Sequence, residues 1–506
     1  MKRVFALLLV LCMTLPFAAC PNNNNNNGGN PDNPNPGDTT PRLDSVGEHN
    51  FNGEEFVVSM LPSYLGEIYK EEEKPDQRDD AILQRNNRMN NLFNVKITSS
   101  YTEGQVAEDH TNAVKRAIND GNVDFHVALG QVWLVGPIIM TGMLYDLRSE
   151  VPYVKDSIGK NDWWNPQSNI AFTLYGRQFV GVSDINMSAL YHTGCLVFNK
   201  DMADDNNVAK SIDARYNTLY DVVEGGDWTL DNMYKIVKDF WRDNPTSGEP
   251  NKVDAEDTFG LLSTTVHPLD LASRAAGIQQ VINDGETTPE LMTMTSTTVA
   301  TIDAISSIWK SSGALTTYSD NDKKFAAGGG LFLTTLLGSL DGETLHEAEI
   351  DFGILPYPKS SKNQKTYLAG VNDSSSVIYA PVGSNDETRK TMIGALTEAL
   401  AAETHRTVVP AYYDVILTHG NTRDEASIPM IDYIYKGRTY DLSMIHSSAS
   451  DELRVAYNGT NVGLAYFTRT AINDGGSAAD MWAGISDTMQ KRLQALAERY
   501  EELTNY

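Results

Sequence analysis

The stretch EFVVSM at residues 55–60 begins a regular alternation of strand and helix patterns that decides the fold class. Its apolar, β-branched and aromatic content is typical of a strand. Four further elements continue in the order helix, strand, helix, strand, over residues 79–93, 95–98, 109–118 and 124–129. Strands separated by helices at this spacing are joined by right-handed crossovers, which predicts an α/β fold with a largely parallel sheet.

The limits of these elements indicate where a ligand would bind. The strand over 124–129 is expected to end at Gly130. In open parallel sheets, ligands meet the loops that follow the carboxyl ends of the strands, which here are residues 61–66 and 130–136. The helix over 79–93 is expected to bury one face, formed by Ile82, Arg85, Met89 and Leu92.

Helix-capping patterns mark three helices later in the chain. Thr229 is expected to cap the first of them, and Ser384 with Glu387 predicts a capping box for the second, which ends before Pro410. Ser477 with Asp480 has the same form and opens the terminal helix. The faces expected to be buried are Met233, Ile236, Val237 and Phe240, then Met392, Leu396 and Ala399, then Ile485, Met489, Leu493 and Leu496.

The first residues have the pattern of an export signal. Lys2 and Arg3 precede a short apolar run over residues 4–11, which is too short to cross a bilayer because a spanning helix needs about 20 apolar residues. The run LPFAAC at 15–20 resembles a bacterial lipobox, in which the cysteine is acylated and becomes the mature N-terminus. We therefore expect a signal peptide over 1–19 and a lipid on Cys20. The alternative is a secreted protein in which this cysteine is incidental.

The segment that follows Cys20 has nothing apolar to bury. Residues 21–42 consist almost wholly of Asn, Pro, Gly, Asp and Thr. Such a composition cannot offset the conformational entropy lost on ordering, which predicts a disordered tether over 20–44. A tether after a lipidated cysteine suits a folded body held at the outer face of a bacterial cell membrane.

Cysteine content and charge narrow the possibilities for the folded part. Without the signal and the lipidated residue, only Cys195 remains, so no internal disulfide forms, and its apolar neighbours favour a buried structural thiol. The length of residues 45–506 suggests two domains. The formal net charge of −27 argues against nucleic acid or an anionic membrane surface as partner.

Most sequence signatures of enzymes and cofactor sites are missing. The chain has no H-E-x-x-H, G-x-S-x-G, phosphate-binding G-x-x-x-x-G-K-[ST] or G-x-G-x-x-G pattern, and its nine histidines lack ligand spacing. The glycines at 328–330 precede an apolar strand pattern and favour a close backbone approach. No cofactor or metal is expected. A glycosidase-type pair of carboxylates stays open, because such pairs need proximity in space only.

Four short segments together resemble one family. They are LVFNKDM at 196–202, GDWTLD at 226–231, DFGILPYPK at 351–359 and RDEAS at 423–427. In this order they are similar to motifs of the bacterial extracellular solute-binding proteins of family 1, the maltose-binding-protein-like receptors of ABC importers. The similarity extends from about Asn50 to the C-terminus.

The resemblance implies a two-lobed periplasmic-binding-protein-like fold (type II) with a hinge and an interlobe cleft. The first lobe would comprise 45–184 and 373–418, and the second 185–372 and 419–506. One solute, by similarity a carbohydrate, would bind between the lobes and favour their closed state, because only that state contacts it from both sides. The permease subunits of an ABC importer would then recognise the closed form.

Candidate solute contacts lie in the predicted loops and at the predicted lobe crossings. Trp133 could stack on a sugar ring, or it packs under its loop. Asp184 and Asn186 could hold hydroxyl groups, or Asp184 stabilises a turn at the crossing. Four further candidates are Tyr64, Asn372, Asp373 and Arg469.

Other aromatic positions are interpreted as structural. Similar proteins often place a stacking aromatic residue near Thr334 and Thr335, whereas this chain has Leu336 and Leu337 there and departs from that pattern. Trp228 is expected to act as a hydrophobic staple before its helix. Trp163 and Trp164 are expected to pack on one lobe, and Trp482 in the core.

The leading hypothesis is a lipid-anchored receptor, not an enzyme, that delivers a carbohydrate to an ABC importer. The alternatives are a surface glycoside hydrolase with an unmarked carboxylate pair and a lipoprotein that serves as an adhesion or scaffold factor. Catalytic turnover of a bound glycan would distinguish the first alternative.

Overall fold

The first sheet is built by the alternating segment that begins the folded chain. A computed structural model describes residues 43, 45–68, 77–101, 106–244, 254, 256–383, 386–419, 422–448 and 453–503. The strand order is β13-β3-β1-β2, in which both neighbours of β1 are parallel to it and β13 is antiparallel to β3. The strands are β1 (Glu54–Met60), β2 (Val95–Tyr101), β3 (Val127–Gln131) and β13 (Ser376–Tyr379). The predicted, largely parallel sheet is confirmed, but β3 starts later than expected and continues through Gly130.

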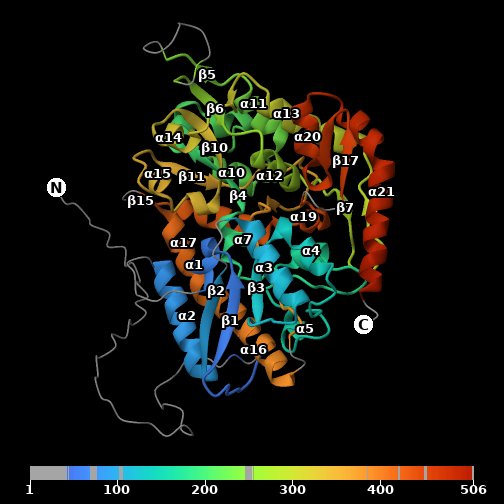
Figure 1. Cartoon of the computed structure of the whole chain (residues 1–506). Helices are drawn as coiled ribbons and strands as arrows, with labels where there is room; N and C mark the ends of the chain where they lie inside the picture. Colours follow the sequence, from blue (N-terminus) through green and yellow to red (C-terminus); the bar gives the residue numbers. More distant parts are fainter. Residues whose placement is uncertain are drawn as a thin grey trace, which may run out of the picture. The chain divides into compact units, whose positions relative to one another are not determined.

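Two helices connect these strands, as predicted. They are α2 (Gln77–Phe93) and α3 (Ala107–Asn119), and α2 lies along β2 (Figure 1). Ile82, Arg85 and Met89 are buried, but Leu92 is 41% exposed, so its predicted burial is wrong. Phe93, four residues after Met89, fills the core instead. A helix has 3.6 residues per turn, so residues three and four positions after Met89 both lie close to its buried face. Packing on the sheet selects Phe93, four positions on, over Leu92, three positions on.

The second sheet is mixed. Its order is β11-β4-β10-β6-β5, with β9 paired to β6; β10 is antiparallel to β4 and parallel to β6. Its strands are β4 (Gly194–Asn199), β5 (Trp241–Arg242), β6 (Thr258–Leu262), β9 (Ala314–Leu315), β10 (Gly330–Leu336) and β11 (Phe352–Leu355). Cys195, on β4, is fully buried and burial raises the pKa of its thiol, which confirms the predicted structural role.

The chain passes between the two sheets along neighbouring segments. Thr193 forms an antiparallel bridge with Val371, and Gly181 forms one with Ile378. The Asn372 N–H also donates to the carbonyl of His192 at 2.9 Å. The structure therefore places the two predicted crossings side by side. The lobe boundaries at 184, 372 and 418 stay predictions.

The remaining elements surround these sheets within one compact unit, residues 43–506. The α-helices are α1 (Leu65–Ile68), α4 (Gly136–Ile139), α5 (Val154–Ser157), α6 (Pro166–Ala171), α7 (Met187–Tyr191), α8 (Lys200–Asp205), α9 (Val208–Ile212), α10 (Leu219–Glu224), α11 (Leu230–Val237), α12 (His267–Ala275), α13 (Ser296–Trp309), α14 (Asn321–Ala326), α15 (Glu343–His346), α16 (Glu387–Glu403), α17 (Val409–Leu417), α18 (Ile428–Lys436), α19 (Leu442–Ile445), α20 (Phe467–Asp474) and α21 (Ala478–Glu502). Short 3₁₀ turns are η1 (Pro62–Tyr64), η2 (Val132–Leu134), η3 (Leu337–Ser339), η5 (Glu425–Ser427) and η6 (Leu464–Tyr466), and η4 (Thr404–Val408) is a π-helical turn.

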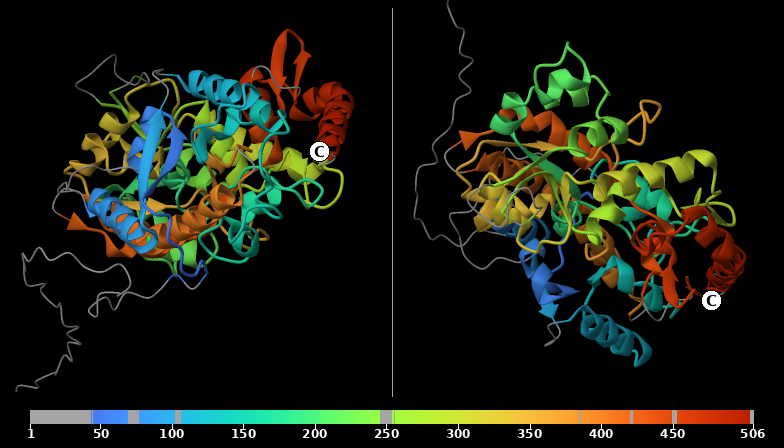
Figure 2. Two further views of the ribbon diagram at one scale, coloured as in Figure 1. Left: turned by 60° about the horizontal axis from the view of Figure 1, so that its bottom comes forward. Right: turned by 90° about the horizontal axis from the view of Figure 1, so that it is seen from above.

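Four two-stranded ladders complete the described part of the fold. They pair β7 (Val281–Ile282) with β8 (Glu290–Leu291), β12 (Ala369–Gly370) with β16 (Arg438–Thr439), β14 (Thr418–His419) with β15 (Thr422–Arg423), and β17 (Arg454–Tyr457) with β18 (Thr460–Gly463). Figure 2 shows the terminal helix α21 beside the β17–β18 hairpin, both in red. Of the helices described, none is both long and apolar enough to cross a membrane.

The four sequence motifs contact one another in the structure. The Lys200 ammonium lies 2.9 Å from the Asp351 carboxylate and 3.1 Å from that of Asp424. These three residues belong to three separate motifs. Trp228, from the remaining motif, is fully buried, and its indole N–H donates to the carbonyl of Pro356 at 2.9 Å. The motifs therefore join β4, β11, α11 and η5 to one another.

The capping predictions are confirmed at two of three helices. The side chain of Thr229 accepts from the Asn232 N–H and that of Ser477 from the Asp480 N–H. Helix α16 is capped by Asp386, which accepts from the Thr388 N–H, so Ser384, which lies outside the described residues, is not its cap. Helix α16 ends at Glu403, before Pro410 as predicted, but the π-helical turn η4 leads directly into α17, and Pro410 lies in the first turn of α17.

The remaining tryptophans have structural roles. The indole N–H groups of Trp163 and Trp164 donate to the two oxygens of Glu398 at 3.0 and 2.9 Å. Trp482 is buried, and its ring meets the Phe467 ring edge-on with 4.8 Å between the ring centroids, which confirms its place in the core.

Replacing Trp228 by alanine should destabilise the fold strongly. The substitution removes a fully buried indole and leaves the Pro356 carbonyl without its donor. We expect a loss of about 3–5 kcal/mol in the free energy of unfolding, measured by urea denaturation. Trp133→Ala serves as control, because that residue is only partly buried and should cost far less. Equal losses in the two variants would contradict this assignment.

Candidate functional site

The two loops predicted to face a ligand converge on one turn. The Tyr64 hydroxyl, in η1 after β1, donates to the carbonyl of Ser374. The backbone N–H of Trp133, in η2 after β3, donates to the carbonyl of Asp373 at 3.4 Å. Its indole N–H donates to the Gln131 side chain at 2.7 Å, which holds the ring in place. Residues 372–375 are therefore the point where both loops meet the second crossing.

Asp373 connects this turn to the last part of the chain. Asp373 is buried, with 8% of the residue exposed, and its carboxylate accepts a hydrogen bond from the Tyr466 hydroxyl. Asn372 folds the turn, because its side-chain oxygen accepts from the Ser374 N–H at 2.9 Å. Tyr466 ends η6, and burial together with the nearby Asp373 charge raises the pKa of its hydroxyl.

Charged groups from α12 and α20 complete the site. The Arg469 guanidinium lies over the Tyr466 ring, 4.4 Å from its centroid, and pairs with the Asp270 carboxylate at 2.8 Å. Burial raises the pKa of Asp270 to about 7, against the opposing charges of Arg469 and Arg274. We call the set the Asp373 cluster; its members are Tyr64, Trp133, Asp270, Arg274, Asn372, Asp373, Tyr466 and Arg469.

The structure thus brings together five of the seven predicted contacts. Tyr64, Trp133, Asn372, Asp373 and Arg469 all belong to the Asp373 cluster, although whether each of them contacts a solute stays a prediction. Asp270, Arg274 and Tyr466 were not predicted. The four-residue spacing of Asp270 and Arg274 places them on one helix face, but nothing in the sequence indicated that this face meets residues almost 100 positions later.

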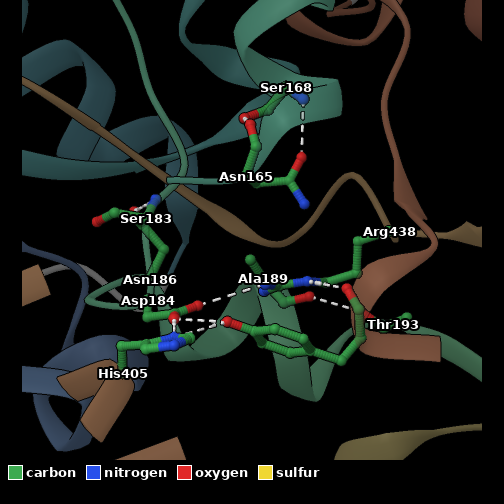
Figure 3. Close-up of polar contacts among 10 residues, drawn as sticks. Asn165, Ser168, Ser183, Asp184, Asn186, Ala189, Thr193, His405 and Arg438 are labelled. Carbon is green, nitrogen blue, oxygen red and sulfur yellow. Dashed lines mark hydrogen bonds and ion pairs between the residues drawn. The ribbon is translucent and has the colours of Figure 1, made fainter. Parts of the chain in front are cut away.

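Asp184 lies in a different polar network, shown in Figure 3. Its carboxylate is 2% exposed and receives the Tyr435 hydroxyl at 2.6 Å, the His405 ring nitrogen Nδ1 at 2.7 Å and the Arg438 guanidinium at 3.3 Å. These donors come from η4, α18 and β16. The geometry favours the alternative interpretation, in which Asp184 is a structural carboxylate at the crossing. It stabilises the crossing through contacts with distant segments and not, as expected, through its own turn.

Asn186 also has protein partners for both ends of its amide. Its oxygen accepts from the Ser183 N–H at 3.0 Å, and its nitrogen donates to the Ser376 hydroxyl at 3.0 Å. Ser376 in turn contacts Ser188 at 2.8 Å and the buried Glu67 at 3.2 Å. These bonds join the two crossings. A solute contact by Asp184 or Asn186 stays an untested prediction.

The Asp373 cluster has the chemistry of a site for a polar organic molecule. It combines the aromatic faces of Trp133 and Tyr466 with two carboxylates and two guanidinium groups. Aromatic faces accept apolar C–H surfaces, while charged groups bond hydroxyls with fixed orientation.

Thr334, on β10, is bonded to the Ser263 hydroxyl at 2.7 Å. Within the described ranges, no group of three His, Cys, Asp or Glu residues has the arrangement of a metal site.

Comparison with known proteins identifies the fold. No family model matches the sequence, and no curated protein matches it. Among solved structures, the cyclic α-maltosyl-1,6-maltose binding protein from Arthrobacter globiformis is similar with a TM-score of 0.51 at 12% identity, over 88% of this chain and 99% of the other. A sugar transporter from Rhizobium etli in an open conformation gives 0.50 at 13% identity, with the same coverage. The predicted two-lobed fold of solute-binding proteins is confirmed.

Loss of the His405 side chain should destabilise the protein in a pH-dependent way. The hydrogen bond to Asp184 raises the pKa of His405, so its contribution is full below the unfolded pKa of about 6.5 and is lost as pH rises through the folded pKa. We expect His405→Gln to cost about 1 kcal/mol near pH 5.5 and less near pH 8.5, measured by urea unfolding. His49, bonded to Tyr153 and the Val46 carbonyl, provides the control His49→Gln. A larger cost at pH 8.5 than at pH 5.5 would contradict the proposed pairing.

Proposed function

We propose that this chain is an extracellular solute-binding protein of the family 1 type, which captures a carbohydrate and delivers it to an ABC importer. The observation that carries the proposal is the convergence at Asp373. Loops after two strands of the first sheet meet helices packed with the second sheet at the crossing between them. A solute bound there would contact both halves of the molecule, as a receptor that closes on its ligand requires.

The similar structures support a sugar as the solute class. The Arthrobacter globiformis protein binds a cyclic maltosyl-maltose, and the Rhizobium etli protein is a sugar transporter. In this chain, Trp133 offers an aromatic face at the convergence, and Asp373 and Asp270 offer acceptors for hydroxyl groups. Glycans combine C–H faces with hydroxyl rims, which is the chemistry that such a set of groups recognises.

Attachment to the membrane is the second part of the proposal. The lipobox-like run at 15–20 supports acylation of Cys20, and the segment 20–44 would act as a tether to the folded body. Cys20 and the whole of the predicted signal lie outside the described residues. The receptor would then stand at the outer face of a bacterial cell membrane beside the permease subunits.

A glycoside hydrolase is the second candidate, and one observation favours it. Asp270 and Asp373 are neighbouring carboxylates, and the pKa of Asp270 is raised to about 7, as a general acid requires. However, Asp270 is paired with Arg469 at 2.8 Å and Asp373 accepts the Tyr466 hydroxyl, so both are bound by protein donors. A structural pair of this kind is better suited to binding than to proton transfer.

A glycan screen of residues 43–506, which contain both sheets, tests the function. We expect an oligosaccharide to bind near micromolar, about −8 kcal/mol, and to add about 2.7 kcal/mol of stability at one hundred times Kd. Trp133→Ala should weaken binding about tenfold, or 1.4 kcal/mol, because the stacking face is lost, while the unliganded melting temperature changes little. Calorimetry and thermal denaturation provide the two measurements.

A matched tryptophan and a product assay complete this test. Trp241, on β5, is also partly buried, and its indole N–H donates to the Asp257 carboxylate at 2.7 Å. Because Trp241 does not belong to the Asp373 cluster, Trp241→Ala should leave glycan affinity unchanged. The bound glycan should be recovered intact after long incubation. Hydrolysis of the glycan at catalytic rates would show that the protein is a hydrolase and not a receptor. If no carbohydrate binds, the proposed solute class is wrong.

Substitution of Cys20 tests the anchor separately. Cys20→Ser removes the thiol that would carry the lipid, so fatty-acid labelling should disappear and the protein should leave the detergent phase. Several acyl chains hold a protein firmly at a membrane, whereas one holds it only marginally. Cys195→Ser, which alters a buried thiol, is the control and should remain in the detergent phase. Equal partitioning of wild type and Cys20→Ser would rule out lipidation at this residue.

A further inference from the structure

Three buried arginines in this protein differ in how their donors are satisfied. Arg85 is 1% exposed, and each nitrogen of its guanidinium donates to a protein oxygen, among them the Thr404 hydroxyl and the carbonyls of Glu67 and Ile68. Arg438 is 2% exposed and has the Asp184 carboxylate as its counter-ion at 3.3 Å. Its Nε donates to the carbonyl of Tyr435, and only its Nη1 has no partner among the described residues. The fold therefore holds both arginines, as buried charges normally are held.

Arg274 is buried to nearly the same extent without such partners. It is 4% exposed, and its Nη1 donates to the carbonyl of Val371 at 3.2 Å. Its Nε and Nη2 have no hydrogen-bond partner among the residues that the structure describes. These two nitrogens form one edge of the planar guanidinium and present two parallel N–H donors, which is the fork that matches two oxygens of one acid group.

The neighbouring acids act on the charge of Arg274 from a distance, but none of them accepts a hydrogen bond from it. Asp270, one helical turn earlier on α12, is paired with Arg469, and Asp373 accepts from Tyr466. In the described part of the chain, no carboxylate oxygen lies within 4.0 Å of the Arg274 guanidinium. A buried guanidinium with one carbonyl partner is costly to the fold, because two of its donor atoms have lost water without gaining an acceptor.

We propose that the Nε–Nη2 edge of Arg274 binds a carboxylate of the solute, so that the solute is an acidic carbohydrate containing a uronic acid. The inference rests on the proposed function and names its substrate class. The two oxygens of the carboxylate accept the two parallel N–H bonds, and its negative charge strengthens both of them. Asp270 and Asp373 stand close by, so a doubly charged phosphate would be repelled more strongly than a carboxylate. Trp133, which is only partly buried, offers an aromatic face for the sugar ring.

Matched pairs of glycans test this assignment directly. The probes are oligosaccharides of glucuronic, galacturonic, mannuronic and guluronic acid, each compared with its carboxyl-reduced counterpart of identical linkage, and with phosphorylated sugars. Titration calorimetry on residues 43–506 should show at least tenfold tighter binding of one acidic glycan than of its reduced form. In Arg274→Gln that preference should disappear, and Arg274→Lys, which keeps the charge but not the fork, should lose most of it.

Unliganded stability separates a solute anchor from a structural residue. Arg274→Gln removes a buried guanidinium with two unpaired donors, so its melting temperature without ligand should equal or exceed that of the wild type. Arg85→Gln is the matched control: it removes a buried arginine whose nitrogens are all bonded, and its melting temperature should fall clearly. A comparable fall in both Arg274 variants would overturn the proposal, because Arg274 would then be part of the fold.

The other outcomes distinguish this inference from the proposed function. Equal affinity for an acidic glycan and its reduced form, or tighter binding of a phosphorylated sugar, would overturn the carboxylate assignment and leave the carbohydrate receptor standing. Arg274-dependent binding of small organic acids without binding of any glycan would support the carboxylate contact and overturn the carbohydrate. Failure of every probe to bind would overturn both.

Discussion

The connection between the two sheets depends on the hydrogen bonds that the buried Asp184 carboxylate accepts. It is buried at the first crossing and receives donors from three segments that follow the second crossing: His405, Tyr435 and Arg438. A charge in this position is tolerable only when it is bonded on all sides. The network therefore ties the chain before residue 186 to the π-helical turn η4 and to α18, and the crossings at 181–193 and 371–378 lie side by side as a result.

The Asp373 cluster differs from this network in the way its charges are compensated. At Asp184 every acid oxygen has a donor, and the hydrogen bond to Asp184 raises the pKa of His405, which stabilises its charged form. In the Asp373 cluster, Arg274 keeps two donors unpaired although it is buried, and burial holds the Asp270 pKa near 7. Groups whose pairing is complete stabilise the fold, whereas an incompletely paired group is the usual cost of a site that binds another molecule.

The four sequence motifs owe their spacing to contacts within the fold. Lys200 meets Asp351 and Asp424, and Trp228 meets the chain at Pro356. Each of these contacts joins two different motifs, so the motifs mark where the segments around β4, β11, α11 and η5 meet. All members of the Asp373 cluster lie outside the motifs.

The sequence by itself determined the local elements: the parallel strands that begin at 54, the helices capped by Thr229 and Ser477, and the buried thiol of Cys195. Periodicity and capping act over a few residues, so they are visible in the chain. It also indicated the loops of Tyr64 and Trp133, since loops after parallel strands share one edge. Tertiary structure alone decided that Asp184 bonds His405, Tyr435 and Arg438 and that Arg274 and Tyr466 join Asp373. These contacts link residues about 100 to 250 positions apart, and no local pattern encodes which helix faces meet.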